Sequence, residues 1–209
     1  MPELVQPIVL LRSGCHEDAV RCAAEVSLRA YLAAPDRPEW QEWLSGIFTK
    51  TVRRAKATEY EKARVEGALA EVRHGEAAAL GFAPFPAHAL PRALARLQVS
   101  GTDLERSGWD RAPEDAHCVV ALNESLGMST GKAAAQAAHA LWAVWLQMGG
   151  RNQERWATDN LAFRLIGVPA EEMGLERLLG IDHAVHVAIH DAGLTEVEPG
   201  SLTAVGVMV

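Results

Sequence analysis

The sequence of 209 residues has little of what marks secreted or membrane-spanning proteins. Its three cysteines, Cys15, Cys22 and Cys118, are too few and too irregularly spaced for a disulfide framework or a CxxC pair. Each apolar run is interrupted by Arg, Lys, Glu or His before it is long enough to cross a bilayer. The N-terminal segment carries Glu3 where a secretory signal would carry a base. We therefore expect a cytoplasmic protein with reduced thiols and no membrane partner.

Positive charge is scarce in the second half of the chain. Residues 101–209 hold 7 Lys and Arg against 15 Asp and Glu, whereas residues 1–100 hold 13 against 12. Because phosphate contacts need clustered cations, a chain with a net charge of −7 is not an obvious nucleic-acid binder. The one dense basic cluster lies in the first half and comprises Lys50, Arg53, Arg54 and Lys56. On a helix, three of these four cations would share one face, which suits either solvent or a phosphate backbone.

Hydrophobic patterning divides the chain into two α/β halves. Residues 7–12 have the composition of a strand and precede a helical pattern over 17–34, and residues 117–122 precede a second helical pattern over 129–147. When Ile8 is set against Val119, the two segments align without a gap, and Arg21, Glu25 and Leu28 fall on Lys132, Gln136 and His139. This match predicts an internal duplication.

The predicted fold class is α/β, with a small mixed β-sheet and helices packed on it, duplicated as two pseudo-symmetric halves. The first half spans residues 1–98, and residues 99–115, rich in Gly, Ser, Asp and Pro, form the connection. The second half spans 116–209 and ends in an alternating strand over 182–190, a Pro-Gly turn and a final strand over 202–209. We expect a monomer with two pseudo-dimeric halves.

Three polar residues interrupt the most apolar stretch of the sequence, MSTGKAAAQAAHALWAVWL at 128–146. Lys132, Gln136 and His139 follow one another at spacings of four and three, which places them within about 60° on one helix face. The face is either a solvent-exposed stripe or a polar line that opens onto a cleft in a buried helix. Lys132 follows a helix cap at Ser129 or Thr130, where free backbone N–H groups favour an anion.

Other catalytic and metal-binding motifs fit this sequence less well. GMSTG at 127–131 is literally G-x-S-x-G, but the six residues NESLGM separate its serine from the strand, whereas in a nucleophile elbow the serine follows its strand directly. A P-loop would be one residue short and would have Ala133 in place of its Ser or Thr. We expect no metal site, because a strand would turn His183 away from His186 and His190. A serine triad stays open, with its other members drawn from Asp159, Asp182, His183, His186 and His190.

Two segments carry a family resemblance. MSTGKAAAQAAHA at 128–140 and HDAGLTEVEPGSLTAVGV at 190–207 resemble the GK-x-x-x-Q-x-x-H-A helix and the DAG-x-T and PG-x-x-T segments of type-2 peptidyl-tRNA hydrolases. The resemblance covers residues 116–209. With its TVRRA and RLQVSGT stretches, the whole chain resembles a longer, actinobacterial-type branch of that family.

The resemblance implies hydrolysis of the ester between a peptide and the 3′ ribose of tRNA, without a metal or an organic cofactor. The functional positions that it implies are Lys132, Gln136, His139, Asp191, Thr195 and Thr203. Lys132 would stabilise the developing oxyanion, and the threonines would bind water or ribose through hydrogen bonds. Whether Asp191 or His139 is the base stays open.

Two departures from the family pattern leave a second function class open. Thr130 and Leu194 stand where family members carry Lys and Arg, which removes two cations from the expected tRNA-facing rim. The alternative function is a non-catalytic RNA- or protein-binding descendant of the same fold. If the chain does bind tRNA, the first half is expected to dock it through Lys50, Arg53, Arg54 and Lys56.

Overall fold

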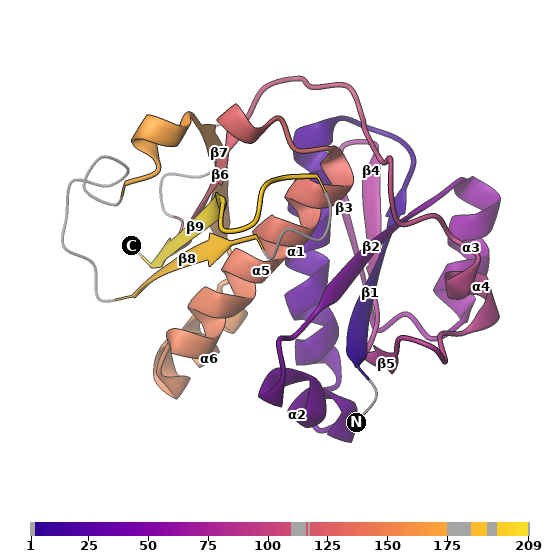
Figure 1. The fold of residues 1–209 in the computed structure, drawn as a ribbon. Coiled ribbons are helices and arrows are strands. Elements are labelled where there is room, and N and C mark those ends of the chain that lie inside the picture. Colours follow the sequence, from indigo (N-terminus) through magenta and orange to yellow (C-terminus); the bar gives the residue numbers. More distant parts are fainter. Residues whose placement is uncertain (1–2, 110–115, 117, 175–184, 192–195, 209) are drawn as a thin grey trace. The chain divides into compact units, whose positions relative to one another are not determined.

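The computed structural model describes residues 3–109, 116, 118–174, 185–191 and 196–208. Contacts divide the chain into two compact units. The first unit comprises Met1–Ser107 and Ser129–Ala135, and the second comprises Gly108–Met128 and Gln136–Val209. Each unit contains one mixed β-sheet (Figure 1). In the part of the chain that the structure describes, no helix is long and apolar enough to cross a membrane.

The sheet of the first unit is built around its first strand. β1 (Leu4–Leu11) lies between β2 (Lys50–Ala55), which is parallel to it, and β4 (Ala77–Gly81), which is antiparallel. β3 (Ala70–His74) pairs with the other edge of β4, so that the order is β2-β1-β4-β3. A short strand, β5 (Phe85–Pro86), pairs with the beginning of β1.

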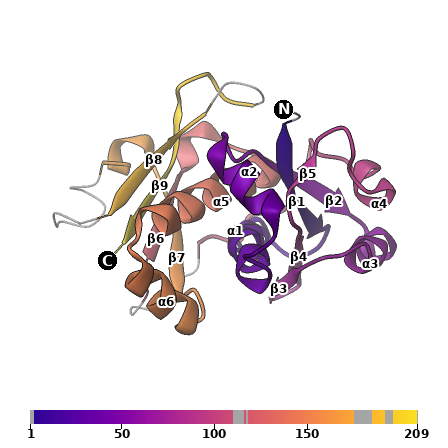
Figure 2. The ribbon, with the colours of Figure 1, turned by 90° about the horizontal axis from the view of Figure 1, so that it is seen from below.

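Helices cover both faces of this first sheet (Figure 2). α1 (His16–Ala33) packs on β3 and β4, and its first turn carries Glu17 and Asp18, which favour a helix N-terminus. On the opposite face, Tyr60 and Leu94 join Val9 and Leu80 in a buried apolar cluster. The remaining helices of the unit are α2 (Pro38–Ser45), α3 (Ala57–Val65) and α4 (Arg92–Ala95).

The second unit repeats this plan. β6 (Cys118–Asn123) lies between the parallel β7 (Phe163–Val168) and the antiparallel β9 (Leu202–Met208), and β8 (His186–His190) pairs with β9 at the edge. The order β7-β6-β9-β8 therefore matches β2-β1-β4-β3. The strands follow one another along the chain in the same way, and corresponding strands run in the same relative directions. The helical elements are η1 (Glu124–Leu126), α5 (Thr130–Gln147), α6 (Gly150–Thr158) and η2 (Ala170–Glu172), and the first residues of α5, up to Ala135, belong to the first unit. The predicted α/β class, with mixed sheets in two repeated halves, is confirmed.

The register of the repeat differs from the ungapped alignment. Ile8 pairs with Gly81 and Val120 pairs with Gly206, which moves the strand correspondence by one residue. α1 and α5 are both 18 residues long, and each passes close to the glycine of its own sheet. The nearest helix carbonyls are those of Val26 for Gly81 and Ala140 for Gly206. The helices therefore correspond from their first residues, His16 and Thr130.

This register corrects the predicted counterparts of the polar line. Lys132, Gln136 and His139 are the third, seventh and tenth residues of α5, and Asp18, Cys22 and Glu25 occupy those positions in α1. The predicted equivalents Arg21, Glu25 and Leu28 are wrong, because alanine-rich helices match one another in more than one register. The approach of each helix to the glycine of its own sheet fixes the right one, with Val26 at Gly81 and Ala140 at Gly206.

Candidate active site

The polar line of α5 consists of two partly exposed side chains and a buried one. Lys132 and His139 are partly exposed, whereas Gln136 between them is only 6% exposed. The Lys132 backbone N–H donates to the Ser129 hydroxyl over 3.3 Å, so Ser129 caps the helix, as one of the two expected caps. Lys132 therefore lies in the first turn of α5, where the helix dipole favours an anion. The line is neither wholly solvent-exposed nor wholly buried.

Gln136 joins the two motif segments of the second unit. Its Nε2 donates to Oδ1 of Asp191 over 3.1 Å, and its Oε1 accepts a hydrogen bond from the Thr203 hydroxyl over 2.8 Å. All three side chains are buried. Because a carboxylate only accepts, this pair of contacts fixes the orientation of the amide, with its nitrogen toward Asp191 and its oxygen toward Thr203. We call Thr203, Gln136 and Asp191 the relay.

Backbone hydrogen bonds hold Asp191 beside the Pro-Gly turn. Its N–H donates to the Ser201 carbonyl over 2.9 Å, and its own carbonyl accepts from Gly200 N–H over 2.8 Å. Gly200 has φ of +81°, a left-handed conformation that suits glycine. Backbone hydrogen bonds therefore join Asp191, the first residue of the DAG segment, to the PG-x-x-T segment. Thr195, the remaining predicted site threonine, lies outside the described residues.

Burial explains why a lysine is absent at position 130. Thr130 is fully buried, and its hydroxyl accepts from Leu104 N–H over 2.9 Å and lies 3.0 Å from Nδ1 of His16. Next to it, Gly131 N–H donates to the Thr102 carbonyl over 3.0 Å. The segment after residue 98 thus covers the start of α5, where a lysine ammonium would be desolvated. Leu194, the other departure, lies outside the described residues.

The structure gives little support to a serine triad or to a metal site. Ser129 acts as a helix cap, three residues after η1, and not at a strand-to-helix elbow. Asp159 is exposed and faces Arg155 at 3.8 Å. Among the described residues, no group of three or more His, Cys, Asp or Glu could hold a metal ion. Asp182 and His183 lie outside that part of the chain.

The basic cluster forms strand β2, and the expected helix there is wrong. Thr51 and Val52 favour a strand, and parallel pairing with β1 supplies the partner that the local sequence does not reveal. Arg53 is 8% exposed, and its Nη1 donates to the carbonyls of Leu94 and Leu97 over 3.2 and 3.1 Å. Lys56, just after the strand, is exposed.

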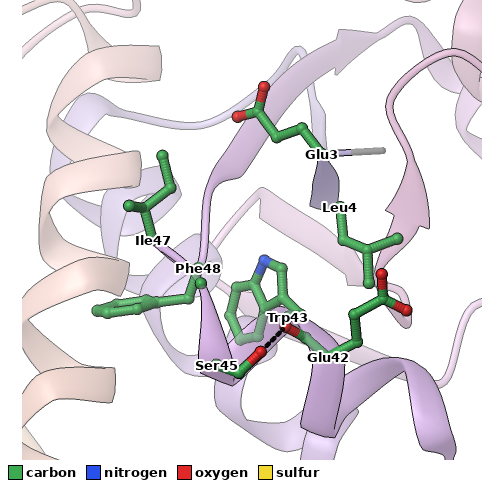
Figure 3. A pocket seen from close by; sticks show the side chains of 8 residues that line it. Glu3, Leu4, Glu42, Trp43, Ser45, Ile47 and Phe48 are labelled. Carbon is green, nitrogen blue, oxygen red and sulfur yellow. Dashed lines mark hydrogen bonds between the residues drawn. The ribbon is translucent and has the colours of Figure 1, made fainter. Parts of the chain in front are cut away.

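Lys50, the first cation of the cluster, is also buried. Its ammonium lies 4.8 Å from the ring centre of Trp43 and 4.4 Å from that of Phe48, and it donates to the Phe48 carbonyl. Burial lowers the pKa of Lys50 well below its usual range. The same two aromatic residues line a cavity of about 270 Å³, together with Glu3, Leu4 and Glu42 (Figure 3).

The first unit lacks the relay at the corresponding positions. Cys22 and Ala78 stand where Gln136 and Thr203 stand, and burial raises the pKa of the Cys22 thiol to about 12, so that it stays protonated. Glu25, the counterpart of His139, contacts His74 at 2.9 Å and Arg29 at 2.6 Å. Burial opposes its ionisation, yet hydrogen bonds from His74 and Arg29 outweigh burial and lower the pKa of Glu25. At the positions of Gln136 and Thr203, the first unit thus has a thiol and a methyl group, which cannot form the hydrogen bonds of the relay.

The second unit is an α/β unit in which a buried amide links a carboxylate and a hydroxyl from two segments. A model of the family described as "Peptidyl-tRNA hydrolase PTH2" matches residues 116–208. The chain is 31% identical over 126 residues to peptidyl-tRNA hydrolase 2, mitochondrial, of Bos taurus, across 56% of this chain and 68% of the relative. It is 36% identical over 93 residues to a peptidyl-tRNA hydrolase of Methanococcus vannielii, across 42% and 80%. The chain belongs to the type-2 peptidyl-tRNA hydrolase family.

Proposed function

We propose that this chain hydrolyses the ester between peptide and tRNA in peptidyl-tRNA and releases free tRNA. The observation that carries the proposal is the relay. Gln136, from the helix motif, holds Asp191 of the DAG segment and Thr203 of the PG-x-x-T segment through 3.1 and 2.8 Å hydrogen bonds. Buried hydrogen bonds thus join the two segments that carry the family resemblance in this chain.

In the proposed reaction, water attacks the ester carbonyl carbon. A new carbon–oxygen bond forms, the bond to the ribose 3′ oxygen breaks, and the water proton passes to a base while the 3′ oxygen takes up a proton as it leaves. Lys132, at the positive end of α5, faces charge that develops on the carbonyl oxygen. Asp191 and His139 are the two candidate bases, and Gln136 orients the Asp191 carboxylate. Thr195 is proposed to bind water or ribose, whereas the expected contact of Thr203 with ribose is replaced by a proposed role in holding Gln136, because its hydroxyl is buried.

Contact with the tRNA backbone is proposed for the exposed end of the basic cluster. Burial of Lys50 and Arg53 moves this proposal to Lys56, which is exposed, and to the partly exposed Arg54. Arg54 also donates to the Gly101 carbonyl and to the side chain of Gln98. The first half, proposed as residues 1–98 before the connection at 99–115, would thus dock RNA while residues 116–209 do the chemistry.

A longer, actinobacterial-type branch is the proposed subgroup. The two stretches that suggest it, TVRRA at 51–55 and RLQVSGT at 96–102, lie against each other, because Arg54 N–H donates to the Gln98 carbonyl over 2.9 Å. Their contact supports treating them as one structural feature of the first unit. We also propose a cytoplasmic monomer, in keeping with three cysteines that are all free thiols.

The function is tested with an N-acetylated aminoacyl-tRNA, the smallest mimic of peptidyl-tRNA. The proposal predicts release of the N-acetylated amino acid and intact tRNA. Filter binding of the same tRNA is measured in parallel. Binding without ester cleavage would favour the alternative, a non-catalytic RNA-binding descendant of the fold, and would overturn the proposed activity.

A further inference from the structure

Strand β6 ends at a buried asparagine, Asn123, whose side chain both donates and accepts a hydrogen bond. The ladder between β6 and β9 runs to the pair Leu122 and Ala204, and the next pair would set Asn123 opposite Thr203. Instead, the Asn123 side chain donates from Nδ2 to the Leu202 carbonyl over 2.9 Å. Its Oδ1 accepts from Ser125 N–H over 3.1 Å and caps η1. Asn123 is 6% exposed.

The acceptor of Asn123 belongs to the peptide bond that enters Thr203. On the other side of β9, the ladder with β8 has an irregularity between Ile189 and His190, where His190 pairs with Leu202 and Ile189 with Ala204. Thr203 is therefore not paired with a residue of β6 or of β8 in either ladder. At a bulge of this kind, regular pairing does not set the direction of the extra side chain. The hydrogen bond from Asn123 fixes the plane of the Leu202–Thr203 peptide instead.

The hydroxyl group of Thr203 lies within hydrogen-bond distance of two acceptors. Its hydroxyl lies 2.8 Å from Oε1 of Gln136 and 3.0 Å from the Ile189 carbonyl oxygen, so one proton serves two acceptors. A small rotation of the Leu202–Thr203 peptide would favour the Ile189 carbonyl and release Gln136. Gln136 would then hold Asp191 less firmly, because its amide is fixed at both ends by these contacts.

We propose that Asn123 is a positioning residue for hydrolysis, acting through Thr203 and Gln136 on Asp191. The proposal rests on the proposed function, because it assigns Asn123 to the same site. The family motifs that point to the relay do not include this position. The sequence signal for it is a polar residue that ends an otherwise apolar strand, HCVVALN, immediately before the loop that leads to α5.

The substitution Asn123→Asp tests one of the two side-chain hydrogen bonds, because it removes the donor and retains the acceptor. The aspartate keeps an oxygen that can accept from Ser125 N–H, but it has lost the donor to Leu202 and places a carboxylate against that carbonyl. We expect kcat to fall between about 10- and 100-fold with KM little changed, because misplacement of a supporting group slows the chemical step. The matched control is Gln153→Glu, since Gln153 donates its side-chain amide to the Trp145 carbonyl on the far part of α5 over 2.7 Å. That variant should keep wild-type kcat.

A double-mutant cycle with Thr203→Val tests whether Asn123 acts through Thr203. If it does, Asn123→Asp lowers kcat in the wild-type background and changes it little when Thr203 is already valine. Independent, multiplying effects would overturn the proposal, as would an equal loss in Gln153→Glu. The ¹H–¹⁵N resonance of the Gln136 side-chain amide gives a readout that needs no hydrolysis. It should shift in Asn123→Asp, and an unchanged resonance would also overturn the proposal, whereas an inactive wild type with a shifted resonance would contradict only the proposed function.

Discussion

At the scale of single residues, the site depends on amide and hydroxyl groups that the sequence marks only in part. Gln136 and Thr203 could be predicted from their motifs, but the direction of each hydrogen bond follows from three-dimensional packing. Asn123 was not predicted, because its acceptor, the Leu202 carbonyl, is far from it in the chain. The cations of β2 were assigned to RNA from charge alone, whereas Arg53 is buried and donates to the carbonyls of Leu94 and Leu97.

Lys50 provides a test of that burial. Lys50→Met keeps the apolar stem and removes the ammonium, so we expect a higher unfolding midpoint at pH 7. Because the folded-state pKa of Lys50 is lowered, the unfolded chain binds the extra proton, and wild-type stability rises as pH rises toward the ordinary lysine value. The gain from Lys50→Met should therefore shrink as pH increases. Urea unfolding between pH 6 and pH 10 measures this trend, and a gain that grows with pH would contradict it.

At the scale of elements, the apolar strand-length runs and the long helical patterns of the sequence predicted strands and helices well. The helix expected at 129–147 is α5, Thr130–Gln147, and the final strand expected at 202–209 is β9, Leu202–Met208. The short basic segment 50–56 was assigned the wrong element, because its strand conformation depends on pairing with β1. The contact of α5 with its sheet also depends on a distant residue, Gly206 in β9.

Gly206→Ala should loosen α5 from its sheet. A methyl group at this position would lie 2.6 Å from Cγ2 of Val144 and 3.1 Å from the Ala140 carbonyl oxygen. Overpacking of this kind costs about 1–3 kcal/mol of unfolding free energy. Gly150→Ala is the control, because its added methyl meets nothing within 4 Å. Equal stability of the two variants in chemical denaturation would show that α5 does not need this close approach.

The salt dependence of tRNA binding tests the exposed end of the basic cluster. Lys56→Gln should lower the slope of log affinity against log salt by about one unit if the ammonium contacts a phosphate. Lys62→Gln on α3 is the control, since Lys62 is also exposed but lies outside the cluster. Fluorescence anisotropy at several salt concentrations gives both slopes. The docking proposal fails if the Lys56 variant keeps the wild-type slope.

At the scale of the whole molecule, one strand order occurs twice, and the relay lies in the second unit. The sheets β2-β1-β4-β3 and β7-β6-β9-β8 have the same order and directions. The duplication could be predicted from the sequence, because both copies begin with an apolar strand and an alanine-rich helix. Its register could not, because small residues fit many alignments, and only the approach of each helix to its sheet glycine shows that Cys22 corresponds to Gln136. The boundaries proposed at residues 98 and 116 stay predictions.

Loss of the relay in the first unit makes the second unit the place where catalysis is expected. At the position of Lys132, the first unit has Asp18, which would repel the developing oxyanion that a lysine stabilises. The account therefore predicts one active site per chain. With substrate in excess, the burst of ester cleavage should release one equivalent of product per polypeptide, and a burst of two equivalents would contradict the account.

The central claim is that this chain cleaves peptidyl-tRNA at the site containing Asp191, and one measurement tests it most directly. Single-turnover hydrolysis of an N-acetylated aminoacyl-tRNA is followed with the wild type, Asp191→Asn, Lys132→Ala and the control Asp159→Asn, whose carboxylate is exposed on α6's C-terminal side. The account predicts ester cleavage by the wild type and the control, and a rate constant lower by about 100-fold or more in the other two variants, with unfolding midpoints little changed. A wild type that binds the tRNA and leaves the ester intact would contradict it, as would Asp191→Asn with the wild-type rate constant.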